Sequence, residues 1–335
     1  MGFVSYKNLI ENIYEKLLNI KVRDDVARFL SEGICQNSLR GIDSHGIRLL
    51  PHYIDALNGG RLNKNPELYF KQTSSSTGIL DGDHAPGYAA GNNAMMHAIS
   101  IAKKTGISAV SVHNSSHFGA AAFYALKAAD QDMIGLSFTN ATAHVLSYNG
   151  IRPFFGNNPV CMCVPIKDEE PFCLDMATTV STFNQIQKYK EEGKKIPVGW
   201  AVDINGKDTT DPNKVHSLLP IGRYKGFGLS MMVDIFCSLL SGMPFGPSVT
   251  AMFDGKLDNK RQLGHFFVVI DIKSFQDVEN FKSRMKEMVN MVRTEPSKDP
   301  NEKVICPGDP EKKVKAIRLK EGIPVREELW EYIIQ

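Results

Sequence analysis

The sequence predicts an α/β fold preceded by a helical segment. In the first fifth of the chain, apolar residues recur at helical spacing, and from about residue 77 strand-like and helix-like patterns alternate with short connections. The Gly-x-Gly-x-x-Gly sequence that marks a Rossmann dinucleotide fold is absent. A dinucleotide would therefore bind to this α/β fold by another geometry.

Three helices are expected in the N-terminal segment. Leu9, Ile13 and Leu17 share one helical face, and a second helix is expected over about residues 26–39. A third helix should begin near Pro51, because proline suits a first helical turn, and should stop at Gly59.

The alternation after residue 77 supplies the layers of the α/β fold. Helices are expected over 89–105 and 117–130, and each is followed by a strand, at 107–114 and 133–140. The other expected elements are strands at 159–166, 172–178 and 265–272, a hairpin turn at Asn205-Gly206, a buried helix over 226–242, and helices over 276–293 and 326–334. Proline and charge dominate 294–314, where CPGDPE (306–311) predicts a rigid turn.

The composition is that of an ordinary soluble globular protein. Of 335 residues, 42% are hydrophobic and 23% are charged, and the net charge of +2 is spread along the chain, which disfavours a nucleic-acid partner. No apolar run approaches the ~18 residues of a membrane span, and the first residues lack the apolar core of a secretory signal. We therefore expect a cytoplasmic protein without a membrane partner, divided by its length into two or more lobes.

The cysteines are expected to be reduced thiols. None of them forms a Cys-x-x-Cys pair, and most lie in apolar segments, which predicts neither a disulfide framework nor a metal site. The six residues are Cys35, Cys161, Cys163, Cys173, Cys237 and Cys306.

His117 is the first candidate for proton transfer. It follows the expected strand 107–114 and opens the expected helix 117–130, so it should lie beyond a strand's carboxyl end, where open α/β sheets bind ligands. A helix N-terminus disfavours the imidazolium, which would keep a neutral imidazole able to take a proton from a hydroxyl and return it. A capping or surface histidine is the alternative interpretation.

The segment Asp43–Arg48 holds a second polar group. Asp43 and Ser44 can cap the turn that follows, and Gly46 allows a tight bend. His45 and Arg48 are three residues apart, close enough on a helical turn to face one small ligand, and a planar guanidinium suits a carboxylate. The alternative is a plain cap with a solvated arginine and a surface histidine.

Two further segments favour a flat or phosphorylated ligand. Asp175 follows a strand-like run and precedes small residues whose backbone amides can approach a ligand, although a capped strand-to-helix turn shows the same pattern. Lys225 lies beside Gly226 and Gly228 at a helix start. A lysine with glycines at a helix N-terminus is a general phosphate-binding arrangement, although the sequence is not that of a P-loop. Asp234 interrupts the apolar helix and is expected to be paired.

Taken together, seven segments in order resemble the type-2 malate/L-lactate dehydrogenase family over nearly the whole chain. Seven motifs in register are far more specific than any one of them. The segments are RGIDSHGI, NSSHFGAAAFYA, FGNNPV, LDMATT, WAVDINGKDTTDP, LLPIGRYKGFGLSMMVDI and CPGDPE. The wording of KVHSLLP, KGFGL and GMPFG looks most similar to the ureidoglycolate dehydrogenases of that family.

The resemblance implies a non-Rossmann α/β fold in which NAD or NADP lies across a large mixed or antiparallel sheet. It divides the chain into a helical domain (1–70 with 305–335), a cofactor-binding domain (71–190 with 220–304) and a hairpin segment (191–219). It also implies a homodimer with an active site near the subunit interface.

The motif positions imply roles for individual residues. His117 resembles the proton-transferring histidine, with His45 as a second catalytic residue and with Ser44 and Arg48 on the substrate side. The positions that match cofactor contacts are Asn140, Ala141, Asp175, Met176, Ala177, Lys225, Pro307, Gly308 and Asp309.

Two positions depart from the family pattern. The family's arginine lies four residues after the histidine, where this chain has Leu49, and Arg48 stands one residue earlier. Because one residue turns a helical side chain by about 100°, Arg48 would reach the pocket from another angle or miss it. The usual Gly-Thr-Asn-Pro is Gly-Asn-Asn-Pro at 156–159.

These residues predict an NAD(P)-dependent oxidoreductase that interconverts a small 2-hydroxy acid and its 2-oxo acid, of the malate, lactate, sulfolactate or ureidoglycolate class. His117 would accept the hydroxyl proton in oxidation and return it in reduction. The alternatives are a reductase of a cyclic imine carboxylate or of a diketo sugar acid, and a catalytically silent nucleotide-binding relative. The retained His45, His117, Asp175 and Lys225 argue against the silent relative.

Overall fold

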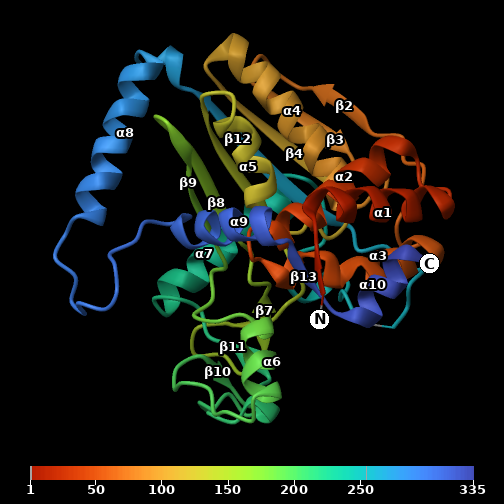
Figure 1. The fold of residues 1–335 in the computed structure, drawn as a ribbon. Helices are drawn as coiled ribbons and strands as arrows, with labels where there is room; N and C mark the ends of the chain where they lie inside the picture. The colour runs from red at the N-terminus through yellow and green to blue at the C-terminus, as the bar shows by residue number, and fades with distance from the viewer. Residues whose placement is uncertain (1, 254) are drawn as a thin grey trace.

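A seven-stranded mixed sheet forms the centre of the computed structural model, which describes residues 2–253 and 255–335 (Figure 1). Its strand order is β2-β3-β4-β12-β5-β8-β9; β3 and β4 pair in parallel, and the other neighbours pair antiparallel. The strands are β2 (Tyr69–Gln72), β3 (Thr77–Asp81), β4 (Ile107–Ser115), β5 (Met133–Thr139), β8 (Val160–Ile166), β9 (Glu169–Met176) and β12 (Leu263–Asp271). The predicted mixed, largely antiparallel sheet is confirmed.

The late strand β12 separates β4 from β5 and creates the edge that carries the site. The chain passes from β4 through α5 (Ala122–Ala129) to β5, and β12 pairs antiparallel with both strands. The carboxyl ends of β4, β5 and β9 therefore meet the beginning of β12 at one edge of the sheet. Open α/β sheets bind ligands at such an edge.

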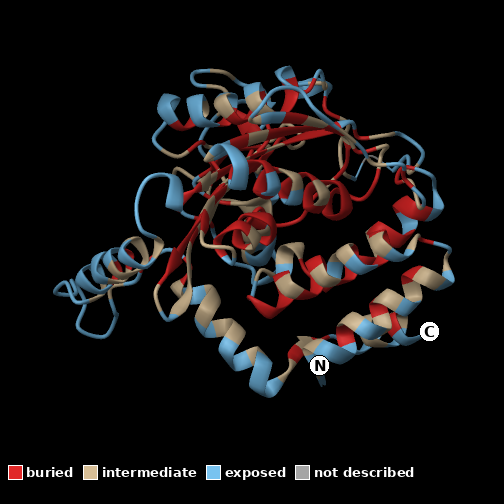
Figure 2. Cartoon of the chain, turned by 90° about the horizontal axis from the view of Figure 1, so that it is seen from above, coloured by how far each residue is buried: buried red, intermediate tan, exposed pale blue. Residues whose placement is uncertain are grey.

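Helices cover both faces of the sheet. On one face α4 (Gly87–Thr105) and α5 pack directly, with α2 (Asp24–Leu39) behind them and α1 (Tyr6–Asn19) on α2. On the other face α7 (Tyr224–Asp234) and the π-helical turn Ile235–Leu239 lie against β5 and β12, and α8 (Val278–Arg293) lies against β8. Figure 2 shows that burial follows the strands and the helix sides turned toward them. In the described part of the chain, no helix combines the length and the apolar character that crossing a bilayer requires.

The two ends of the chain lie together. Strand β1 (Gly2–Val4) pairs with β13 (Ile323–Val325), and α10 (Glu327–Ile334) packs on α1, close to α3 (Leu50–Asn58) in Figure 1. However, one hydrophobic cluster joins Ile34 of α2 to Ala98 of α4 and Ala125 of α5. The predicted domain boundary near residue 70 thus crosses a continuous core and stays a prediction.

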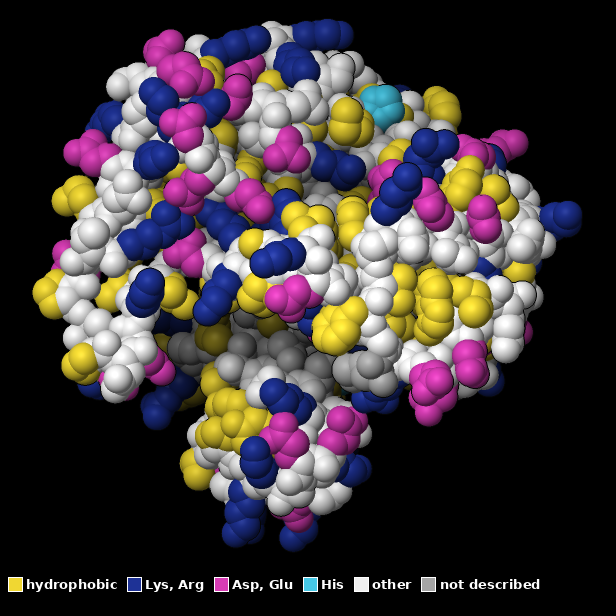
Figure 3. Space-filling view, in the orientation of Figure 1, with side chains coloured by type: hydrophobic (Ala, Val, Ile, Leu, Met, Phe, Trp, Pro, Cys, Tyr) yellow, Lys and Arg dark blue, Asp and Glu magenta, His cyan; other side chains and the backbone are white. Residues whose placement is uncertain are grey.

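A small lobe projects below the sheet in the view of Figure 1. It holds α6 (Phe183–Glu191) and a four-stranded sheet of β6 (Val145–Leu146), β7 (Pro153–Phe155), β10 (Ala201–Val202) and β11 (Ser217–Leu218). Its own cluster comprises Ile186, Ile196, Ala201 and Leu218. Figure 3 shows this lobe set off from the body by a hollow, on a face where acidic and basic side chains are intermingled.

Three sequence expectations were wrong in detail. The helix expected over 117–130 begins at Ala122, because the backbone at Gly119 is left-handed (φ 76°) and interrupts it. The helix expected to be buried over 226–242 exposes Met231 and Leu239, because only one side of it faces the sheet. The charge-rich stretch 294–314, where only a rigid turn was expected, contains the start of a helix, α9 (Asp309–Glu321).

His265 links the three central strands and makes stability depend on pH. Its Nδ1 lies 2.8 Å from Thr139 Oγ1 of β5 and its Nε2 lies 2.8 Å from Ser115 Oγ of β4, with the side chain 0% exposed. Burial lowers the pKa of His265 to about 3. Below pH ~6.5 the unfolded chain therefore binds a proton that the folded chain does not, so the free energy of unfolding falls as pH falls.

We expect protonation of His265 in the unfolded chain to lower the free energy of unfolding by about 1.4 kcal/mol per pH unit as pH falls below ~6.5. Urea unfolding at several pH values between 7 and 5 measures this slope. The His265→Gln variant keeps a polar side chain and should show a shallower slope. Equal slopes for the two proteins would show that His265 does not carry the effect.

Candidate active site

A cavity of about 560 Å³ opens at the edge where the strand ends meet. This volume is within the range of small-molecule sites. Its walls come from the segment between β4 and α5, the ends of β5 and β9, and the turn before α9. Of the sequence-predicted site residues, those that line it are Ser44, His45, His117, Asn140, Ala141, Asp175, Ala177, Pro307 and Gly308.

The two predicted catalytic histidines face one another in this cavity. The rings of His45 and His117 are stacked, with centroids 5.5 Å apart and an interplanar angle of 16°. Ser44 Oγ lies 2.8 Å from His45 Nδ1, and Tyr53 Oη lies 2.6 Å from His117 Nδ1. Because Nδ1 of each ring is engaged, Nε2 is the nitrogen left to meet a substrate.

Both imidazoles are held neutral at pH 7. Burial, reinforced by the charge of Arg48, lowers the pKa of His45 to about 4. Burial also lowers the pKa of His117 well below its usual range, with a smaller contribution from the charges of His45 and Arg261. The expected neutral imidazole is therefore present, but its cause is desolvation rather than a helix N-terminus, since α5 begins five residues later, at Ala122.

Tyr53 is a site residue that the sequence reasoning missed. It lies on α3, is almost fully buried, and its hydroxyl reaches His117 across a sequence separation of 64 residues. When Tyr53 accepts a hydrogen bond from Nδ1–H, Nε2 carries the lone pair that a general base needs. The available signal was a tyrosine on the helix that follows the His45 motif.

We expect Tyr53→Phe to lower kcat by about 10-fold, because one hydrogen bond of about 1.4 kcal/mol no longer orients His117. The KM values should stay nearly unchanged, which separates a positioning role from a loss of binding. Steady-state kinetics against Tyr332→Phe, a matched change on α10, measures this. Equal kcat values for the two variants would remove Tyr53 from the catalytic arrangement.

A buried polar scaffold fixes the backbone of His45. The Asn37 amide donates to the carbonyl oxygen of His45 (2.9 Å) and to Tyr88 Oη (2.8 Å), and Tyr88 Oη donates to the same carbonyl (3.2 Å). Gly119 packs against this tyrosine so closely that an added Cβ would lie 1.9 Å from Tyr88 Oη. Glycine at 119 therefore allows both the left-handed backbone and the close approach.

Asp175 lines the same cavity, near the end of β9. Its Oδ2 accepts a hydrogen bond from the backbone amide of Ala122, the first residue of α5 (2.8 Å). Burial raises the pKa of Asp175 to about 7, and the hydrogen bond from Ala122 opposes this shift. The carboxyl group thus ties β9 to α5 and can change its charge near neutral pH.

The side chain of Asn140 is held by hydrogen bonds to neighbouring segments. Its amide donates to Ser238 Oγ (2.9 Å), and its Oδ1 accepts from the amide of Gly264 (3.1 Å). Asp234, expected to be paired, accepts from Ser238 Oγ (2.6 Å) and from the amide of Gly246 (3.1 Å). These hydrogen bonds join the end of β5 to the π-helical turn. Asn140, which the sequence selected as a site residue, therefore has a structural role as well as a place in the cavity wall.

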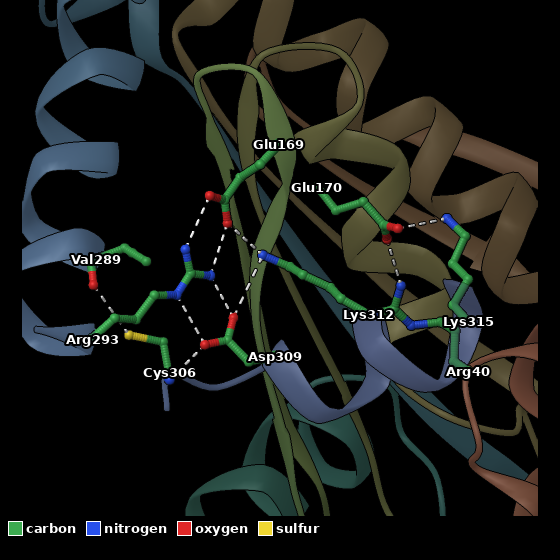
Figure 4. A network of polar contacts seen from close by, with 9 residues as sticks. All are labelled: Arg40, Glu169, Glu170, Val289, Arg293, Cys306, Asp309, Lys312 and Lys315. Atoms are coloured by element: carbon green, nitrogen blue, oxygen red, sulfur yellow. Dashed lines mark hydrogen bonds and ion pairs between the residues drawn. The ribbon is translucent and has the colours of Figure 1, made fainter. Parts of the chain in front are cut away.

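Asp309 supports the cavity from outside. It does not line the cavity; its Oδ2 accepts from Arg293 Nε (3.0 Å) and from the amide of Cys306 (2.9 Å), and Arg293 also binds Glu169 (2.9 Å). Figure 4 shows Arg293 between the two carboxylates, with Lys312 beside them. The network fastens the turn to β9, which lets Pro307 and Gly308 face the cavity.

Three other predicted residues lie outside the cavity lining. Arg48 is exposed and donates to Asn184 Oδ1 of α6 (2.9 Å). Lys225 is exposed in the first turn of α7, and Met176 is not among the lining residues. The arginines that do line the cavity are Arg40 and Arg261, neither of which the sequence reasoning selected.

Arg40 and the small residues beside it fit a phosphorylated, flat cofactor. Arg40 is 3% exposed and binds Glu170 through Nη1 (3.0 Å), while its Nε and Nη2 have no hydrogen-bond partner among the described residues. The segment 119–122, one glycine and three alanines, presents little bulk along the same cavity. Buried guanidinium N–H groups without partners suit the phosphates of a dinucleotide.

This fold and cavity define a non-Rossmann α/β enzyme with a histidine pair at its site. The chain belongs to the malate/L-lactate dehydrogenase family, whose model matches residues 4–334. It is 35% identical to a malate dehydrogenase of Pyrococcus abyssi over 327 residues (95% of this chain, 89% of that protein). It is 31% identical to an NAD(+)-dependent ureidoglycolate dehydrogenase of Escherichia coli K12 over 331 residues (99% and 95%).

A solved structure has the same fold. The malate dehydrogenase of Entamoeba histolytica superposes with a TM-score of 0.93 at 30% identity, covering 99% of this chain and 96% of that one. The similarity thus extends over the whole chain, and its identities do not set the ureidoglycolate dehydrogenases above the malate dehydrogenases.

Proposed function

We propose that the protein is an NAD-dependent dehydrogenase that interconverts a small 2-hydroxy acid and its 2-oxo acid. The observation that carries this proposal is the stacked pair of neutral histidines in a cavity walled by Asp175, small residues and a buried arginine. The names of the relatives, malate and ureidoglycolate dehydrogenase (NAD(+)), support it.

The wall formed by Ala120, Asp175, Ala177 and Gly308 would hold the cofactor, with Arg40 facing its phosphates. When bound, the nicotinamide supplies the chemistry of hydride exchange. The small side chains leave room for a flat ring to approach the histidines.

His117 moves the proton of the substrate hydroxyl. In oxidation the neutral Nε2 accepts the proton while Nδ1–H is held by Tyr53; in reduction the imidazolium returns it to the developing alkoxide. A bound carboxylate favours the imidazolium and so raises the pKa of His117 from its low value in the free protein. Because kcat/KM reports the free protein, we expect kcat/KM for oxidation to be sustained until pH falls through the lowered pKa of free His117.

Arg261 is the arginine best placed to hold the substrate carboxylate. It lines the cavity with His117, is buried, and is oriented by bonds to the carbonyl of Thr250 (3.1 Å) and to Thr142 Oγ1 (3.0 Å). Arg48, which the sequence favoured for this role, points toward α6. A role for Arg48 in binding the substrate stays a prediction.

An exposed apolar stripe supports a homodimer. Met231, Ile235 and Leu239 are exposed and recur every four residues along α7 and the π-helical turn. A monomer rarely exposes such a stripe, and Lys225 lies on the same helix. We propose that a second copy covers it and brings Lys225 to a neighbouring site; sedimentation equilibrium that finds only monomers would contradict this.

The activity is tested by the absorbance of reduced nicotinamide. Purified protein should oxidise NADH with one or more members of a panel of 2-oxo acids, including oxaloacetate, pyruvate and 3-sulfopyruvate, and reduce NAD with the matching hydroxy acids. A cyclic imine carboxylate and NADPH belong in the same panel. Binding of NADH without turnover of any compound would favour the catalytically silent relative instead.

A further inference from the structure

Three buried thiols meet beneath α5. Cys161 and Cys163 are two residues apart in β8, and Cys173 of β9 lies directly opposite Cys163. Alternate residues of a strand, and residues directly opposite one another, point to the same face of a sheet. All three thiols therefore belong to the core cluster that contains the alanines of α5, whereas Met162 between them packs against the cluster of α8.

The sulfur atoms have the spacing of a metal-thiolate centre. The three Sγ atoms lie within 4.8 Å of one another, and those of Cys161 and Cys163 are 3.9 Å apart. A tetrahedral zinc ion bonded to each sulfur at about 2.3 Å would separate the sulfurs by about 3.8 Å. One pair already has this separation, and the third sulfur needs a shift of less than about 1 Å, which rotation about χ1 of Cys173 can supply.

One of the three thiols borders the cavity, so a fourth coordination position can open there. Cys161 and Cys163 are 0% exposed, whereas Cys173 is 6% exposed and lines the cavity wall. Three protein ligands with one open position is the arrangement of zinc sites that bind water or a small molecule.

A buried arginine in the same cavity can offset part of the charge of such a centre. A divalent ion with three thiolates carries one net negative charge, which is costly to bury alone. Arg40 lines the same cavity; its Nη1 is already paired with Glu170 (3.0 Å), while its Nε and Nη2 have no hydrogen-bond partner among the described residues.

We propose that Cys161, Cys163 and Cys173 form a binding site for one thiophilic divalent ion of the zinc class, open to the cavity at Cys173. Binding releases the protons of the three thiols and leaves the oxidation state of each sulfur unchanged. This proposal departs from the sequence prediction that the cysteines hold no metal, because strand register brings Cys-x-Cys together with a third cysteine ten residues later.

Cadmium is the probe, because its thiolates absorb in the ultraviolet. The full chain, reduced and stripped with a chelator, is incubated with Cd²⁺, desalted, and analysed for metal per chain and for thiolate absorption. We expect one tightly held ion per chain, competed by Zn²⁺. Wild-type protein that retains no ion, or an ion without thiolate absorption, overturns the site.

Matched variants separate this site from the other cysteines. Cys161→Ser and Cys163→Ser should lower the affinity by on the order of 100-fold or more, and Cys35→Ser and Cys237→Ser, which alter buried thiols elsewhere, should keep it. If the β8 variants unfold, Cys173→Ala decides, since this thiol borders the cavity. Undiminished binding by folded Cys173→Ala overturns the proposal. The metal content is measured without substrate or cofactor, so this result is independent of the dehydrogenase assay.

Discussion

His117→Ala is expected to lower turnover by about 10²- to 10⁴-fold in both directions, which is the usual contribution of a general acid–base group. The variant removes the imidazole that Tyr53 orients and that faces His45. Steady-state rates with the best substrate of the panel measure the loss. Binding of NADH, followed by its fluorescence, should persist, because the proposed cofactor wall is built from other residues.

Two histidine variants serve as comparisons for this result. His97→Ala removes a partly buried histidine that stacks on Phe70, away from the cavity, and should keep wild-type turnover. His45→Ala should lower turnover less than His117→Ala, because Tyr53 binds His117 and not His45. If folded His117→Ala turns over within about twofold of the His97 variant, the proton-transfer assignment is wrong.

Arg261→Lys is expected to lower kcat/KM for the acid substrate by roughly 10- to 100-fold, mainly through KM. A charge-assisted hydrogen bond contributes about 1.5–3 kcal/mol, and lysine cannot reproduce the planar, paired donors of arginine. An ester of the same substrate lacks the negative charge. We therefore expect the variant to lose much of the preference for the acid over the ester, which a purely structural change would leave intact.

Arg48→Met is the corresponding test at the arginine that the sequence favoured. Since Arg48 donates to Asn184 Oδ1 outside the cavity, its loss should change kcat/KM for the acid by less than about threefold. If Arg48→Met abolishes the preference for the acid and Arg261→Lys keeps it, the substrate arginine is Arg48 and the small lobe rearranges when substrate binds.

Local patterns were sufficient for most of the helices and strands. The expected strand at 107–114 is β4 (Ile107–Ser115), and the helix expected over 276–293 is α8 (Val278–Arg293), because side-chain periodicity within one element reports which of its faces is buried. The same patterns missed the start of α5 at Ala122, since the left-handed backbone at Gly119, which packs against Tyr88 on another helix, cannot be seen in side-chain periodicity. They also concealed α9, whose charged residues pair with β9 rather than forming an apolar stripe.

For the site, the sequence by itself selected residues that meet in space: His45, His117, Asp175 and the Pro307-Gly308 turn all line one cavity. Tertiary structure alone decided how they are oriented. Tyr53 reaches His117 from α3, and Arg261 takes the place in the cavity lining that Arg48 was expected to fill. The physical reason is that motifs record residue types along the chain, whereas strand register and helix packing decide which distant side chains meet.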